Sequence, residues 1–114
     1  MARYTCSYIA NVPFEKLQTV LSELLRTCNF DIIYRISDYM MAREIPGKVN
    51  FAKLVTVEVL IDHTTATAEQ VQVNFVVKNE ELPLQLDNHC RQMFDRVKDL
   101  LAQDSHWKVL EMQG

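Results

Sequence analysis

His89 and Cys90 are the neighbouring residues whose chemistry comes closest to a catalytic pair. An imidazole beside a thiol can take up the thiol proton and leave a thiolate nucleophile. On a helix, however, adjacent side chains point about 100° apart, and Cys90 falls on an apolar stripe with Met93 and Phe94. Because free cysteine often serves as a small core hydrophobe, we expect Cys90 to be buried and inert.

The other metal-binding and acidic side chains lack the spacing that such chemistry requires. Histidine and cysteine occur at positions 6, 28, 63, 89, 90 and 106, without the paired spacing of structural zinc ligands. Glu80 and Glu81 are consecutive, so in an extended chain their carboxylates project to opposite sides. Asp95 and Asp99 lie four residues apart, on what we expect to be a solvated helix face.

Glycine is too scarce for the common phosphate-binding loops. Gly47 and Gly114 are the two glycines of the chain, whereas those loops need several glycines at close spacing. We therefore predict no metal, no cofactor and no catalytic residue, and so a protein that is not an enzyme. An enzyme that brings distant residues together around Cys90 or His63 is the class left open.

Composition indicates one domain over residues 1–114, with 48% hydrophobic and 24% charged residues. The net charge of −3 argues against nucleic acid as a partner. Residues 1–57 hold seven basic and five acidic side chains (+2), and residues 58–114 hold five basic and ten acidic side chains (−5). The acidic second half predicts another protein with a basic surface as the partner, and self-association is left open.

The N-terminal residues contain no apolar stretch of signal-peptide length, and no run of about eighteen apolar residues occurs in the chain. An integral membrane segment is therefore not expected. The three cysteines are odd in number and widely spaced. We expect free thiols and a cytoplasmic location.

Hydrophobic periodicity predicts the secondary structure. The segments expected to form strands are 3–10, 30–36, 39–45, 55–62 and 71–78, with a tight turn at Ser37 and Asp38. Spacings of three and four predict amphipathic helices from Pro13 to near Asn29 and from an N-cap at Asp87 to about Gln103. Residues 107–110 fit either a last strand or an irregular end.

These elements predict an α+β fold of two layers, in which two helices cover one face of an antiparallel sheet of four to five strands. The element order, β-α-β-β-β-β-α, resembles the domain repeat of the TATA-box-binding-protein-like fold. It also resembles, more loosely, the helix-grip folds that enclose small ligands.

Three stretches, AKLVTVEVLID (52–62), VVKNEELP (76–83) and DNHCRQMF (87–94), look like small conserved-hypothetical proteins of cyanobacteria. The resemblance brings no known activity or catalytic residue to these positions. Elimination among the residues predicts a non-catalytic accessory or interaction protein, such as a peripheral subunit or assembly factor of a larger complex. The resemblance implies that this complex is of photosynthetic type.

The side chains expected to face away from the helices are the candidate binding surface. They are Leu54, Thr56, Glu58, Leu60, Gln72, Asn74 and Val76. Three of them are aliphatic, and we expect these three to form the apolar centre of a partner-binding face. A sheet face that simply contacts water is the alternative interpretation.

A second functional hypothesis is a carrier of a small apolar ligand held between the sheet and the first helix. Five large side chains could line the mouth of such a cavity, namely Tyr34, Tyr39, Met40, Met41 and Phe51. The two hypotheses differ in which face of the sheet is functional.

Overall fold

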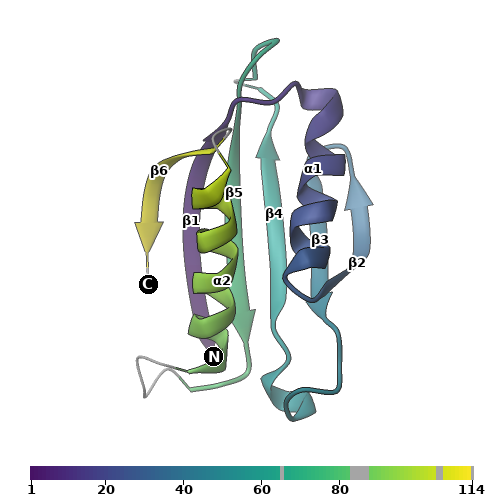
Figure 1. The fold of residues 1–114 in the computed structure, drawn as a ribbon, viewed down its shortest axis with the longest axis vertical. Coiled ribbons are helices and arrows are strands. Elements are labelled where there is room, and N and C mark those ends of the chain that lie inside the picture. The colour runs from purple at the N-terminus through teal and green to yellow at the C-terminus, as the bar shows by residue number, and fades with distance from the viewer. Residues whose placement is uncertain (65, 83–87, 105–106, 114) are drawn as a thin grey trace.

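The computed structural model describes residues 1–64, 66–82, 88–104 and 107–113. Its strands are β1 (Ala2–Ala10), β2 (Phe30–Ile36), β3 (Tyr39–Glu44), β4 (Thr56–Asp62), β5 (Val71–Asn79) and β6 (Trp107–Gln113). Its helices are α1 (Phe14–Thr27) and α2 (His89–Gln103), with a short 3-10 turn, η1 (Phe51–Lys53). All strands form one antiparallel sheet in the order β2-β3-β4-β5-β1-β6, with both helices on one face (Figure 1).

The predicted α+β class, element order and two-layer arrangement are confirmed. The sheet has six strands, one more than expected, because the end of the chain pairs with β1 as β6.

The predicted N-cap of the second helix is wrong. Asn88 caps α2 instead, its side-chain oxygen accepting a hydrogen bond of 2.8 Å from the Arg91 N–H, while Asp87 lies outside the described residues.

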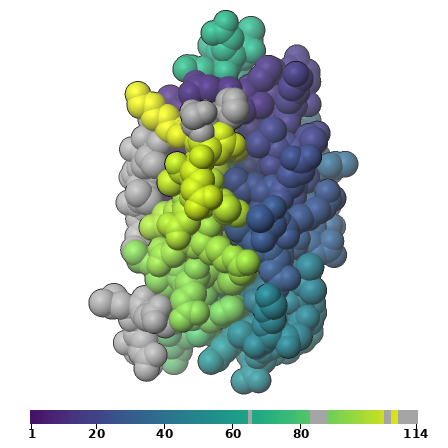
Figure 2. All heavy atoms as spheres, in the orientation of Figure 1, coloured from purple at the N-terminus to yellow at the C-terminus, as the bar shows by residue number. Residues whose placement is uncertain are grey.

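The core lies between the sheet and the two helices. Alternate residues of the central strands face it, and the apolar stripes of α1 and α2 cover them. Tyr8, Phe75 and Trp107 meet there edge to face, with ring centroids 5.8 to 6.1 Å apart. Figure 2 shows this side of the molecule covered by the helices, so the opposite side of the sheet is the one without a helical layer.

A β-bulge in β2 changes which of its side chains face the core. The register shifts between Ile32 and Tyr34, so that Ile32 pairs with Ala42 but Tyr34 pairs with Met41. Without the bulge, the even-numbered residues of β2 would all point toward the helices. With it, Tyr34 and Ile36 lie on the face that the helices leave open.

Candidate functional site

The predicted open-face residues lie where the alternation placed them, except at Leu54. Thr56, Glu58 and Leu60 of β4 point away from the helices, as do Gln72, Asn74 and Val76 of β5. Leu54 precedes β4 and is buried. It is therefore not part of an exposed strand row.

The expected aliphatic cluster of Leu54, Leu60 and Val76 does not form. Strand register sets Leu60 opposite Asn74, and Val76 opposite Glu58. Leu60 and Val76 thus each face a polar neighbour across the β4–β5 pair, and Leu54 is buried, so the three side chains do not form one exposed apolar centre.

Leu60 instead joins a patch on the β2–β3–β4 side of the open face. Tyr39 lies between Leu60 and Ile36 in the strand register, and Met41 pairs with Tyr34. We name the five residues Tyr34, Ile36, Tyr39, Met41 and Leu60 the aromatic patch. Tyr34, Ile36 and Leu60 are 52%, 46% and 43% exposed, and the rings of Tyr34 and Tyr39 lie 5.9 Å apart.

Glu58 anchors the aromatic patch. The Tyr39 hydroxyl donates to Glu58 Oε2 at 2.6 Å, and Lys78 Nζ lies 2.5 Å from Glu58 Oε1. The hydrogen bond from Lys78, with that from Tyr39, lowers the pKa of Glu58. Burial, together with the bond to Glu58, raises the pKa of Tyr39 to about 12, so the phenol stays a donor and its ring is held in place.

The open face is not acidic, although Glu58 and Asp62 against Lys78 in the sequence predict an acidic one. Arg3 and Arg43 join Lys78 on this face of β1–β5, because Arg3 pairs with Lys78 and Arg43 pairs with Thr56. On this face of the same strands the carboxylates are Asp31, Glu58 and Asp62. The charges therefore balance, and the preference for a basic partner stays a prediction without support from this surface.

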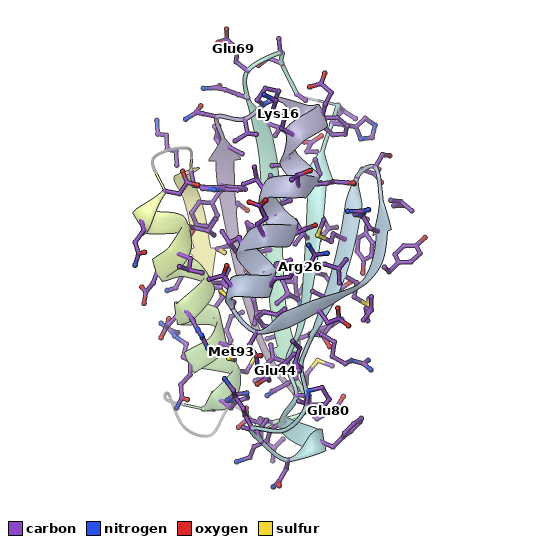
Figure 3. All side chains as sticks on the ribbon, turned by 45° about the vertical axis from the view of Figure 1, so that its right-hand side comes forward. Lys16, Arg26, Glu44, Glu69, Glu80 and Met93 are labelled. Atoms are coloured by element: carbon purple, nitrogen blue, oxygen red, sulfur yellow. The ribbon has the colours of Figure 1, made fainter. Side chains whose placement is uncertain are left out.

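A second polar group of residues lies at one end of the fold, on the helix side. Glu44 ends β3 and is 1% exposed (Figure 3). Its Oε1 accepts hydrogen bonds from His89 Nε2 at 2.8 Å and from the Val55 N–H at 3.1 Å, and its Oε2 lies 3.0 Å from the same imidazole nitrogen. One buried carboxylate thus joins β3, the entry to β4 and the first turn of α2.

Glu81 completes this cluster. It accepts hydrogen bonds from the backbone N–H of Cys90 at 2.9 Å and of His89 at 3.4 Å, and from Asn79 Nδ2 at 2.6 Å. Burial opposes ionisation of Glu81, but these hydrogen bonds outweigh it and lower its pKa. The carboxylate also neutralises the positive end of the α2 dipole, so the cluster fastens this helix to the sheet.

The cluster contains an imidazole and carboxylates but no activated nucleophile. Cys90 is buried, with its Sγ 3.6 Å from the Val77 carbonyl oxygen, and burial raises its pKa to about 12. A neutral thiol that faces backbone carbonyls cannot act as a thiolate. The other histidines lie elsewhere: exposed His63 is 3.7 Å from Asp38, and His106 is outside the described residues.

All three thiols should resist modification in the native protein. Burial raises the pKa of Cys6 and Cys90 to about 12 and that of Cys28 to about 11. We expect a disulfide reagent at pH 8 to label each at least about a hundredfold more slowly than a cysteine peptide, with full labelling in denaturant. Rapid native labelling of Cys90 ahead of Cys6 would contradict the buried arrangement.

The five side chains expected to line a carrier cavity do not share one site. Met40 is buried toward the helices, whereas Tyr34, Tyr39 and Met41 belong to the opposite face. Phe51 lies on η1 and is 77% exposed. The sheet itself separates these groups, so they cannot surround a ligand between the sheet and α1.

Two features of these sites are not predicted by the local sequence pattern. Glu44 shares its strand phase with Met40 and Ala42, and a carboxylate on the core side of a strand was the available signal that it has a buried partner. Its partner His89 is 45 residues away, which no local pattern reveals. Tyr34 and Ile36 join the open face through a bulge that the alternation does not indicate.

Comparisons with known proteins do not assign the chain to a family. No protein-family model matches the chain, and no curated protein matches it. Within the part of the chain that the structure describes, no helix is long and apolar enough to cross a membrane.

Proposed function

We propose that this protein is a non-catalytic interaction protein that binds another protein through the aromatic patch on the open face of its sheet. The observation that carries the proposal is the uncovered row of Ile36, Tyr39 and Leu60 across three adjacent strands. Aromatic and aliphatic groups gathered on one sheet face are typical of a binding surface, because each would otherwise expose apolar area to water.

The arrangement of the patch supports this role. Tyr39 is held by its hydrogen bond to Glu58 and packs beside Tyr34, so little side-chain freedom is lost when a partner docks. Tyrosine and methionine are enriched at protein interfaces. The bulge in edge strand β2 discourages strand addition at that edge, which favours docking against the face.

Charge distribution suggests the kind of partner. Since Arg3, Arg43 and Lys78 balance the carboxylates of β1–β5, the complementary surface is an apolar one of low net charge. Nucleic acid would require an excess of cations that this face lacks. The further proposals, a cytoplasmic location and membership of a photosynthetic-type complex, rest on cysteine usage and on the sequence resemblance.

Site-specific crosslinking tests the proposal. A photoreactive amino acid at Ile36 should give one dominant protein adduct in native lysate, at an intensity that depends little on salt. The same amino acid at Arg96, which is exposed on α2, should not give that adduct. An adduct of twice the chain mass would identify a second copy as the partner.

Competition provides the control. Excess unlabelled protein should suppress the Ile36 adduct, and a Leu60→Arg variant should compete at least about tenfold less well, since a charge would replace an apolar contact in the patch. Leu60 is 43% exposed, so the free energy of unfolding of this variant should differ from that of the parent by less than about 0.5 kcal/mol. Identical adducts from Ile36 and Arg96, or full competition by Leu60→Arg, would overturn the proposal.

A further inference from the structure

A hollow of about 290 Å³ lies at the opposite end of the open face from the β2–β3 turn, beside η1. Its lining combines a sheet floor with residues of the β3–β4 connection and the ends of β5 and β1. The lining residues are Met1, Arg43, Phe51, Ala52, Leu54, Thr56, Lys78, Asn79 and Glu80. Figure 3 shows Glu80 at this end of the molecule.

Three adjacent strands form the floor. Thr56 of β4 pairs with Arg43 of β3 on one side and with Lys78 of β5 on the other. With neighbouring strands about 4.8 Å apart, a hydroxyl group lies between two cations in a single row across the sheet. Such a row presents several hydrogen-bond donors toward the same small volume.

The row holds the cations Arg43, Lys78 and Arg3, and the carboxylate of Asp31 lies at its β2 end. Arg3 lies directly opposite Lys78, a like-charge pair that weakens a sheet. Lys78 is bound to Glu58. Arg43 lies opposite Asp31 in the β2–β3 register, but no ion pair joins these two side chains, both of which the structure describes, so the guanidinium keeps its hydrogen-bond donors. The Arg43 guanidinium is thus the donor group left for a ligand, and its planar fork fits a carboxylate.

The wall of the hollow is apolar. Phe51 exposes 77% of its surface on η1, and Leu54 and Met1 also line the space. A phenylalanine this exposed contributes little to the stability of the fold, because folding leaves most of its apolar area in contact with water. A ligand ring packed beside Phe51 would remove apolar area of both groups from water.

We propose that this hollow binds a small organic monoanion, a carboxylate attached to a single aromatic ring or a short alkyl chain. The carboxylate lies between the Arg43 guanidinium and the Thr56 hydroxyl, and the apolar part packs against Phe51 and Leu54. Glu80 on the rim disfavours a second negative charge, which selects monoanions over dianions. The site is separate from the aromatic patch and does not depend on the proposed protein docking.

Phenylacetate is the probe for this site, and amide chemical shifts are the readout. We expect saturable shifts at residues 51–56 and at Lys78 during a millimolar titration. The neutral analogue 2-phenylethanol should bind at least about tenfold more weakly, because it lacks the charge-assisted hydrogen bonds to Arg43. The Arg43→Gln variant should lose about tenfold in phenylacetate affinity, and Thr56→Val should lose less.

Arg35→Gln is the matched control, since Arg35 is an exposed arginine of β2 that lies opposite Met40, away from the hollow. It should bind phenylacetate as the parent does. The same spectra report whether each variant is folded. Absence of saturable shifts in the parent, equal binding of 2-phenylethanol, or equal weakening by Arg35→Gln and Arg43→Gln would each overturn the proposal.

Discussion

Replacing Glu44 with alanine should lower the free energy of unfolding by about 3–5 kcal/mol. The change removes the acceptor of His89 Nε2 and of the Val55 N–H, which leaves the buried Val55 N–H and the mostly buried His89 imidazole without this partner. Breaking one side of a buried pair costs the desolvation of the remaining group. Urea denaturation at neutral pH measures the effect.

Two further variants separate the pair from its surroundings. Glu80→Ala removes an exposed carboxylate at the same end of the molecule and should change stability by less than about 0.5 kcal/mol. Removing both partners in Glu44→Leu with His89→Leu should cost less than the two single changes added together, because no unpaired donor remains at this pair. A loss below about 1 kcal/mol for Glu44→Ala would show that the carboxylate does not fasten α2 to the sheet.

Raising the pH from 8 to 10.5 should lower stability by about 2 kcal/mol per buried thiol. In the unfolded chain the thiols ionise near pH 9, whereas in the folded protein burial raises the pKa of Cys6 and Cys90 to about 12 and of Cys28 to about 11. The folded state therefore keeps protons that the unfolded state releases. The contribution of the protonated thiols to the free energy of unfolding is therefore fully present below about pH 9. It is lost progressively as the pH rises through the pKa values of the folded protein.

Tyr8 adds to the same loss at higher pH, since burial raises its pKa to about 12. A Cys28→Ala variant tests the cause: it should be less stable than the parent at pH 8 but lose about 2 kcal/mol less between pH 8 and 10.5. Denaturation curves at successive pH values measure both. A parent stability that stays constant up to pH 10.5 would contradict the raised thiol pKa values.

Local patterns predicted most of the fold. Alternation along residues 71–78 identified a strand that the structure extends to Asn79, and spacings of three and four found both helices within a few residues. These predictions succeeded because one-sided burial imposes a period of two on a strand and of 3.6 on a helix. The N-cap was missed by one residue, since Asp87 and Asn88 are equally suited to that position.

The candidate sites were predicted less well. Alternation correctly placed Leu60 and Val76 on the open face, but it did not show that Leu60 pairs with Tyr39 and Asn74 rather than packing with Val76. Register depends on how two strands meet, and the bulge at Ile33 then reversed the phase of the end of β2. The hollow at Arg43 arises from residues of three strands and a turn, so no single segment indicates it.

The sequence by itself determined the class of fold, the face that each strand of the β4–β5 pair turns to the helices, and the burial of Cys28 and Cys90, because each follows from the period of apolar residues within one element. Only the tertiary structure decided the aromatic patch, the Glu44–His89 pair and the hollow beside η1. Each of these depends on contacts between segments far apart in the chain, where strand register, a bulge and the packing of a helix end set which side chains meet.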